Sequence, residues 1–239
     1  MENINNKFSQ TRRRLDVSEM EYYDKFMKKS SNRVSQYGEV KTKNKEIDNM
    51  LGLVNNEIQR VDSRFLEPAC GDGNFLKEIL SKKLDIAFKN SKKDLIKFEI
   101  QAIYGLSSLY GVELLEDNVA ITRKRLRDLI DKSFQDNFQV KLNSEYSKSI
   151  NCILKLNIIH GDALSFKKVK NKDQDIVFSE WSMINDTDFK KRDYTFKDLL
   201  AYQPYNEENL FSDLGDKAFI PHPVKEHKPK NYLKIYEYS

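Results

Sequence analysis

The stretch best suited to ligand chemistry is a turn of small residues, Glu67–Phe75, with the sequence Glu-Pro-Ala-Cys-Gly-Asp-Gly-Asn-Phe. It follows a short apolar run and precedes apolar residues at helical spacing, so we expect a strand, a loop and then a helix. Ala69, Gly71 and Gly73 lack bulk, which lets a ligand approach the backbone closely and lets the turn adopt positive φ angles. The following helix presents free N–H groups and the positive end of its dipole. The pattern therefore predicts a ligand site.

The block Glu67–Phe75 resembles the cofactor motif of S-adenosylmethionine-dependent methyltransferases. The similarity is to the version found in adenine-specific (N6) DNA methyltransferases of restriction–modification systems. The resemblance implies an α/β protein of the three-layer, Rossmann-like class I methyltransferase fold, with a mostly parallel sheet and S-adenosyl-L-methionine as cofactor. Within the block it implies these cofactor-binding residues: Glu67, Ala69, Gly71, Gly73 and Phe75. The alternative is a tight turn without a ligand, because many strand–helix turns carry Gly-x-Gly for geometry alone.

A second predicted strand, Leu109–Leu114, also ends in an acid. A carboxylate at the tip of the strand next to a nucleotide loop can accept hydrogen bonds from both ribose hydroxyls. Tyr-Gly-Val-Glu-Leu is similar to the second motif of the same family, which implies that Glu113 and Leu114 bind the cofactor. The alternative for Glu113 is that it caps the helix expected to begin near Glu116.

The segment Leu156–Leu164 resembles the third motif of the family, in which an Asp borders the exocyclic amine of the cofactor's adenine. This resemblance implies that Asp162 and Ala163 are cofactor-binding residues. His160 has no evident partner in the sequence, so we interpret it as a strand-end residue rather than a catalyst.

The segment Arg33–Thr42 resembles the Gly-Glu/Gln-Val-Phe-Thr-Pro stretch that closes over the methionine end of the cofactor in this family. The residues that the resemblance assigns to the cofactor are Gly38, Glu39 and Val40. Lys41 and Lys43 stand where the family has Phe and Pro, and loss of the aromatic ring removes one wall of the pocket. An ordinary loop before a helix is the alternative.

The acceptor side departs from the family pattern. Asp175–Phe178 reads as a fourth strand, after which DNA adenine methyltransferases carry Asn/Asp-Pro-Pro-aromatic, whereas this chain has Ser179-Glu180-Trp181. As catalytic candidates, Ser179 follows the strand, Glu180 binds the acceptor amine and Trp181 stacks on an extruded base. The alternative is that Trp181 fills space below a truncated sheet and Glu180 pairs with a neighbouring Lys or Arg. Few residues remain beyond this point, so we expect the fold to be incomplete at its C-terminal side.

The elements that position these residues follow from periodicity. We expect helices over 74–88, 94–102, from 116 onward and over 196–202, with an irregular stretch at 133–150. Residues 1–32 are expected to form an N-terminal arm or helix, 33–203 the cofactor-binding domain, and 204–239 a C-terminal extension. On the helix that begins near 116, the basic residues are expected to face outward: Arg123, Lys124, Arg125 and Arg127.

Composition sets further bounds. The 239 residues carry 41 basic and 37 acidic side chains, a net charge of +4 that permits nucleic-acid binding without requiring it. Cys70 and Cys152 are too few for a disulfide framework or a zinc site, which favours a reducing cytoplasm and no metal. No apolar run approaches the ~20 residues of a membrane span and no signal-peptide pattern opens the chain, so we expect a soluble protein without membrane contact.

These observations favour a methyltransferase that modifies N6 of adenine in DNA, with DNA and a specificity or endonuclease subunit as partners. Two alternatives stay open. The first is a catalytically degenerate cofactor-binding subunit or sensor, and the second is a methyltransferase for a different acceptor.

Overall fold

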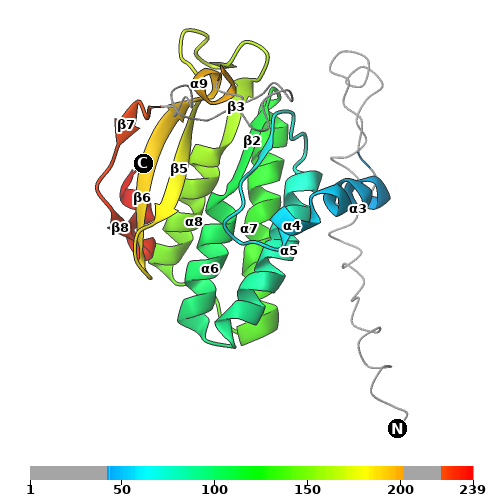
Figure 1. Cartoon of the computed structure of the whole chain (residues 1–239), viewed down its shortest axis with the longest axis vertical. Helices are drawn as coiled ribbons and strands as arrows, with labels where there is room; N and C mark the ends of the chain where they lie inside the picture. Colours follow the sequence, from blue (N-terminus) through cyan, green and yellow to red (C-terminus); the bar gives the residue numbers. More distant parts are fainter. Residues whose placement is uncertain (1–41, 43, 202–221, 239) are drawn as a thin grey trace, which may run out of the picture. The chain divides into compact units, whose positions relative to one another are not determined.

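The computed structural model describes Thr42 and residues 44–201 and 222–238 (Figure 1). By its internal contacts the chain divides into two units, Met1–Lys41 and Thr42–Ser239, and all described residues belong to the second. The arm expected at 1–32 and the entry-segment residues Gly38, Glu39 and Val40 therefore lie outside the described residues. The described part of the expected C-terminal extension, residues 222–238, belongs to the same unit as the sheet.

The described chain runs through α3 (Asn44–Leu53), α4 (Asn55–Ile58), β1 (Phe65–Glu67), α5 (Asn74–Ser91), α6 (Leu95–Ser107), β2 (Leu109–Glu113), α7 (Glu116–Phe138), α8 (Ser144–Asn157) and β3 (Ile158–Asp162). It continues through β4 (Lys167–Lys168), β5 (Val177–Met183), β6 (Asp188–Thr195), α9 (Phe196–Ala201), β7 (Lys225–Glu226), β8 (Lys230–Asn231) and the 3-10 helix η2 (Tyr232–Tyr238). The protein is thus α/β, as predicted. No helix in this described part is both long and apolar enough to cross a membrane.

The first sheet is mostly parallel, which confirms that prediction. Its order is β1-β2-β3-β4; β2 pairs in parallel with both β1 and β3, while β4 is antiparallel to β3. Glu67 lies opposite Gly111, and Glu113 lies opposite His160. The C-terminal ends of three parallel strands therefore meet at one edge, where ligands bind in open parallel sheets.

Two helices run directly into strands of this sheet (Figure 1). Only Ser108 separates α6 from β2, and α8 ends at the residue before β3. Asn157 ties the two junctions together, because its side-chain amide donates to the carbonyls of Ser107 (3.0 Å) and Leu109 (3.1 Å). Helices α5 to α8 pack against one another and against β2.

The two faces of β2 serve different cores. Leu109 packs into the large helical core, whereas Tyr110 and Val112 belong to a second cluster with residues of β3, β5, α9 and their flanks. On the helical face, a Cβ atom at Gly111 would lie 2.9 Å from Cys70 Sγ. Close packing of the turn on the strand therefore requires glycine at this position.

The prediction that residues 175–178 form a fourth strand of the mostly parallel sheet is wrong. Val177 and Phe178 begin β5, which pairs with β6 in a separate antiparallel sheet, from Val177 opposite Thr195 to Met183 opposite Phe189. The physical reason is the connection of residues 184–187, which is far shorter than the dozen or so residues that a parallel crossover requires. Asn185 closes this turn by accepting hydrogen bonds from the amides of Thr187 (3.0 Å) and Asp188 (2.8 Å).

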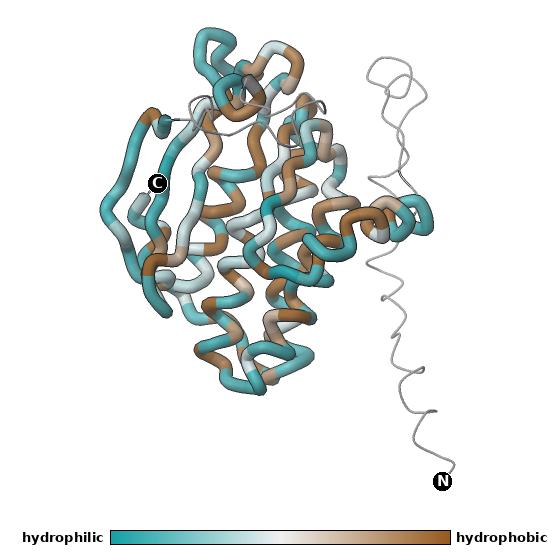
Figure 2. The backbone as a smooth tube through the Cα atoms, in the orientation of Figure 1, coloured by the Kyte–Doolittle hydropathy of each residue, from teal (hydrophilic) through white to brown (hydrophobic). Residues whose placement is uncertain are grey.

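The C-terminal residues complete the second sheet. Strands β7 and β8 pair with β6, and η2 packs on α8, where the rings of Tyr146 and Tyr232 lie 6.1 Å apart. Most residues of β6 and β7 are hydrophilic, whereas hydrophobic and hydrophilic residues alternate along the helices (Figure 2). The core therefore lies between the helices and the two sheets.

The irregular stretch expected at 133–150 is also wrong. Helix α7 continues to Phe138 and α8 begins at Ser144. Asn143 caps α8 by accepting a hydrogen bond from the amide of Tyr146 (2.8 Å). The apolar residues that α8 buries recur at helical spacing: Tyr146, Ile150, Ile153 and Leu154.

Candidate cofactor site

The turn after β1 has the geometry that its glycines predict. Gly71 has φ +54° and Gly73 has φ +79°, both in the left-handed region, and Gly73 caps the N-terminus of α5. The amide of Cys70 donates to the carbonyl of Val112 (3.0 Å), so the turn is tied to the end of the neighbouring strand. The turn therefore lies where β1 and β2 both end.

The two glycines serve different purposes. A Cβ atom at Gly73 would lie 2.6 Å from Cγ2 of Thr122 on α7, so glycine is required for helix packing. A Cβ atom at Gly71 would meet nothing within 4 Å. The open side of the turn is therefore at Gly71, where a ligand could reach the backbone.

Glu113 connects this turn to the start of α7. Its Oε2 accepts a hydrogen bond from the amide of Gly71 and its Oε1 accepts one from the amide of Leu115, both at 2.8 Å. The side chain is buried. The structure thus brings Gly71 and Glu113 together, and the second bond also gives Glu113 part of the capping role considered as its alternative. Asn118 Nδ2 adds a third, longer hydrogen bond to Oε1 (3.5 Å). A carboxylate has about four acceptor positions, so these three bonds leave about one for a ligand.

Helix α7 holds the turn through side chains whose role was not predicted from the sequence. Arg125 Nη1 donates to the carbonyl (2.8 Å) and contacts Oδ1 (3.0 Å) of Asp72, and Thr122 Oγ1 donates to the carbonyl of Gly71 (3.0 Å). Arg123 Nε donates to the carbonyl of Ile158 (3.1 Å). The expectation that Arg123 and Arg125 face outward is therefore wrong, because the packing of α7 on the turn and on β3 directs them inward.

Two further groups in the turn carry shifted pKa values. Burial raises the pKa of Glu67, although its carboxylate also accepts a hydrogen bond from the amide of Ala69 (3.4 Å). Burial, and after it the charges of Glu113 and Glu67, raise the pKa of the Cys70 thiol to about 12. Cys70 is thus a buried spacer in the protonated state and not a nucleophile.

Asp162 ends β3 on the same edge of the sheet. Its Oδ1 accepts from the amide of Leu164 (2.9 Å) and its Oδ2 from the hydroxyl of Ser165 (2.8 Å), and the first of these bonds is the main reason that its pKa is lowered. Ala163 packs on the second core cluster. Glu67, Glu113 and Asp162 thus end three neighbouring parallel strands, as predicted.

Side chains near this edge differ in exposure. Leu114 is 43% exposed, an apolar side chain left in solvent beside Glu113. Phe75, by contrast, packs against the helical core. His160 Nε2 lies 3.0 Å from the carbonyl of Leu114 and links β3 to the end of β2. His160 therefore holds a strand end, as interpreted from the sequence.

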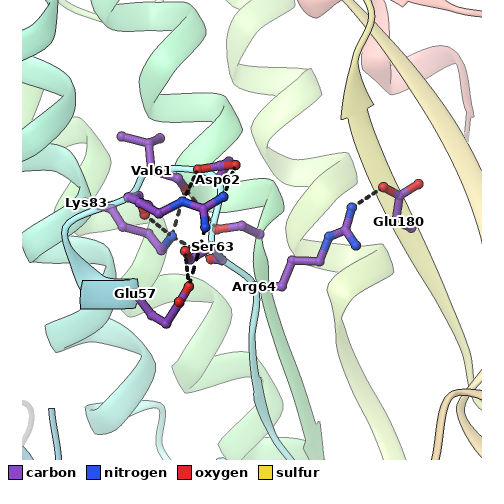
Figure 3. A network of polar contacts seen from close by, with 9 residues as sticks. Glu57, Val61, Asp62, Ser63, Arg64, Lys83 and Glu180 are labelled. Atoms are coloured by element: carbon purple, nitrogen blue, oxygen red, sulfur yellow. Dashed lines mark hydrogen bonds and ion pairs between the residues drawn. The ribbon is translucent and has the colours of Figure 1, made fainter. Parts of the chain in front are cut away.

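A buried lysine on α5 fixes the segment that leads into β1 (Figure 3). Lys83 Nζ donates to the carbonyls of Arg60 (3.1 Å), Val61 (2.7 Å) and Ser63 (2.7 Å). Burial lowers its pKa to about 8. Helix α5 begins at the turn that follows β1, and its Lys83 binds the segment that precedes β1. Lys83 therefore connects the two segments that flank this strand.

The three catalytic candidates lie away from this edge, within β5. Ser179 is buried and donates to Oδ1 of Asp193 (2.9 Å). Glu180 pairs with Arg64 of the segment before β1 and with Arg192 Nη1 of β6 (3.1 Å). Trp181 is 2% exposed and its Nε1 donates to Oδ1 of Asn157 (3.1 Å).

The expected position of these residues at the end of a strand is therefore wrong, and their contacts match the structural alternative. Their catalytic role stays a prediction. The indole of Trp181 fills the core beside α8, so neither of its faces is available to a base. Ser179, Glu180 and Trp181 are held in the middle of an antiparallel strand by its pairing with β6. Comparison with protein-family models gave no match for this chain, and neither a curated protein nor a solved structure was found to be similar to it.

Proposed function

We propose that the chain binds S-adenosylmethionine, or its demethylated product, at the turn Glu67–Phe75. The observation that carries this proposal is the hydrogen bond between the amide of Gly71 and the carboxylate of Glu113, beside the open space at Gly71. This hydrogen bond joins the small-residue turn to the acidic end of β2. These two parts correspond to the first and second motifs of the family that the sequence resembles. In this proposal the parallel sheet corresponds to the first half of the Rossmann-like class I fold.

The residues at the edge fit the parts of such a ligand. Glu113 keeps about one acceptor position for a ribose hydroxyl, and Asp162 has a carboxylate for an exocyclic amine. The exposed side chain of Leu114, which follows Glu113, and Ala163, which follows Asp162, offer apolar contact to a flat ring. Glu67 ends the strand that enters the turn and is the acid suited to an α-amino group.

Among the roles consistent with such binding, we favour a cofactor-binding subunit or sensor. The cofactor supplies an activated methyl group when bound, and transfer requires an acceptor positioned in line with it. Within the described residues, Glu180 is engaged by two arginines and Trp181 is buried, so neither is free to hold an acceptor. N6-adenine methylation of DNA is the second candidate, favoured by the motif block, with a partner subunit supplying the acceptor site.

Binding and turnover are tested separately. Titration calorimetry with S-adenosylhomocysteine should give a dissociation constant in the micromolar range or weaker, and Glu113→Gln should weaken it about tenfold, since one ligand acceptor becomes a donor. Glu145→Gln, an exposed acid on α8, is the matched control. Absence of binding by the wild-type protein would refute the proposal. Incubation with methyl-labelled cofactor and mixed DNA or RNA then decides between the two roles, since only the second predicts labelled nucleic acid.

A further inference from the structure

A cavity of about 330 Å³ lies between the first sheet and the β5–β6 hairpin. Its described lining comes from the start of β1, from β2, from the hairpin and from α9: Arg64, Leu66, Tyr110, Phe178, Glu180, Arg192, Tyr194 and Leu199. None of these described lining residues belongs to the turn Glu67–Phe75. Tyr110 faces away from the helical core, so the cavity is on the other face of β2.

The floor of the cavity is aromatic. The rings of Tyr110 and Phe178 meet edge to face with centroids 5.4 Å apart, and both side chains are more than nine-tenths buried. Within the described ranges the Tyr110 hydroxyl makes no hydrogen bond. Burial raises the pKa of Tyr110, and the charged residues Arg64 and Glu180 line the same cavity. A hydroxyl that makes no hydrogen bond to the described residues keeps its donor for a ligand acceptor.

The rim of the cavity is charged. Arg64 and Glu180 face each other across the space between the sheet and the hairpin (Figure 3), and Arg192 binds the other oxygen of Glu180 at 3.1 Å. Two guanidinium groups thus share one carboxylate at this rim. The Arg64 side chain is 57% exposed, and only one of its five N–H donors is used within the described part of the chain. Arg64 can therefore bind an anion without leaving Glu180.

We propose that this cavity binds a planar aromatic ligand that carries one carboxylate or phosphate group. The ring lies against Tyr110 and Phe178, the Tyr110 hydroxyl donates to a ring or linker acceptor, and the anionic group binds Arg64. The cavity volume is within the range of small-molecule sites, and its mostly apolar lining with a few polar groups is typical of them. The site is separate from the proposed cofactor turn and joins the two sheets.

Aromatic carboxylates and nucleotides share this chemistry, and a paired titration distinguishes them. Naphthalene-2-carboxylate is compared with neutral naphthalene-2-carboxamide, and adenosine 5′-monophosphate with adenosine, each by calorimetry on the full chain. We expect the anion of at least one pair to bind, and to bind about tenfold more tightly than its neutral partner. Tighter binding of the naphthoate identifies an aromatic-acid site, and tighter binding of the nucleotide identifies a nucleotide site.

Variants locate the binding. Arg64→Gln should abolish the preference for the anion, and Tyr110→Phe, which removes only the hydroxyl, should weaken binding about threefold or more. Arg60→Gln is the matched control, because Arg60 is an exposed arginine on the same segment that pairs with Asp62 outside the cavity. Failure of both anions to bind, equal affinity for anion and neutral partner, or unchanged binding by Arg64→Gln would overturn the proposal. Displacement of the bound anion by S-adenosylhomocysteine would overturn its separation from the cofactor site.

Discussion

The amide of Gly71 donates a hydrogen bond of 2.8 Å to Oε2 of Glu113, a residue 42 positions later in the chain. This bond joins the turn after β1 to the end of β2, and the other oxygen of the same carboxylate holds the amide of Leu115 before α7. One buried side chain thus fixes both walls of the open space at Gly71. The proposed cofactor site depends on this arrangement.

Gly73→Ala should destabilise the protein by about 2–4 kcal/mol, because the new methyl group would lie 2.6 Å from Thr122 and the residue has φ +79°. Gly52→Ala is the matched control. Gly52 lies in α3 with nothing within 4 Å of the added Cβ, so this variant should be about 0.5–1 kcal/mol more stable than wild type. Urea unfolding measures both. Equal midpoints for Gly73→Ala and wild type would show that α7 does not pack on the turn as described.

Lys83→Met should cost about 3 kcal/mol of stability at neutral pH, because three buried carbonyls would lose their shared donor. Lys82→Met, the neighbouring change on α5, should be nearly neutral, since Lys82 makes no hydrogen bond or ion pair among the described residues and only its charge acts on Asp85. Chemical denaturation followed by circular dichroism compares the two variants. If both had the same small effect, the segment before β1 would not depend on Lys83.

Asp193→Asn should destabilise the C-terminal strands in a pH-dependent way. Burial raises the pKa of Asp193, but the hydrogen bonds from Lys191, His227 and Ser179 outweigh it and the net shift is downward. A lowered folded-state pKa means that the carboxylate contributes stability above its ordinary pKa of 3.8, and that this contribution disappears as the pH falls through the folded value.

The stability difference between wild type and Asp193→Asn should therefore be about 2 kcal/mol at pH 7 and should shrink below about pH 4. Thermal melts of both proteins over this pH range provide the measurement. The exposed Asp173→Asn variant should show no comparable pH dependence. A constant difference from pH 7 down to pH 3 would contradict the role of the charged network.

The sequence was informative where a local pattern determines geometry. Small residues at 69, 71 and 73 between an apolar run and a helix predicted the turn and its positive φ angles, and acids after the apolar runs predicted the ends of β1, β2 and β3. The family pattern was misleading at Ser179, because alignment to a fourth parallel strand overlooked the Asn185–Thr187 turn. That short turn can connect only antiparallel neighbours.

Other features depend on tertiary contacts that no local pattern carries. Arg125 and Lys124 are adjacent basic residues, and the sequence does not distinguish them. The packing of α7 on the turn directs Arg125 toward Asp72. Lys83 reads as one more basic residue of an amphipathic helix until the path of residues 60–63 is known. By contrast, α8 could have been predicted from Asn143 as an N-cap and from the spacing of Tyr146, Ile150 and Ile153.

The central claim, that the open side of the turn is the cofactor site, is tested most directly by titrating S-adenosylhomocysteine into wild type, Gly71→Ala and Gly52→Ala. A methyl group at Gly71 meets no protein atom within 4 Å, so the variant should fold with a loss of only about 1–2 kcal/mol from its φ of +54°. The methyl group would, however, stand where the ligand approaches the backbone. We predict binding at least about tenfold weaker for Gly71→Ala and unchanged for Gly52→Ala. Equal affinity of all three proteins, or no binding by wild type, would contradict the claim.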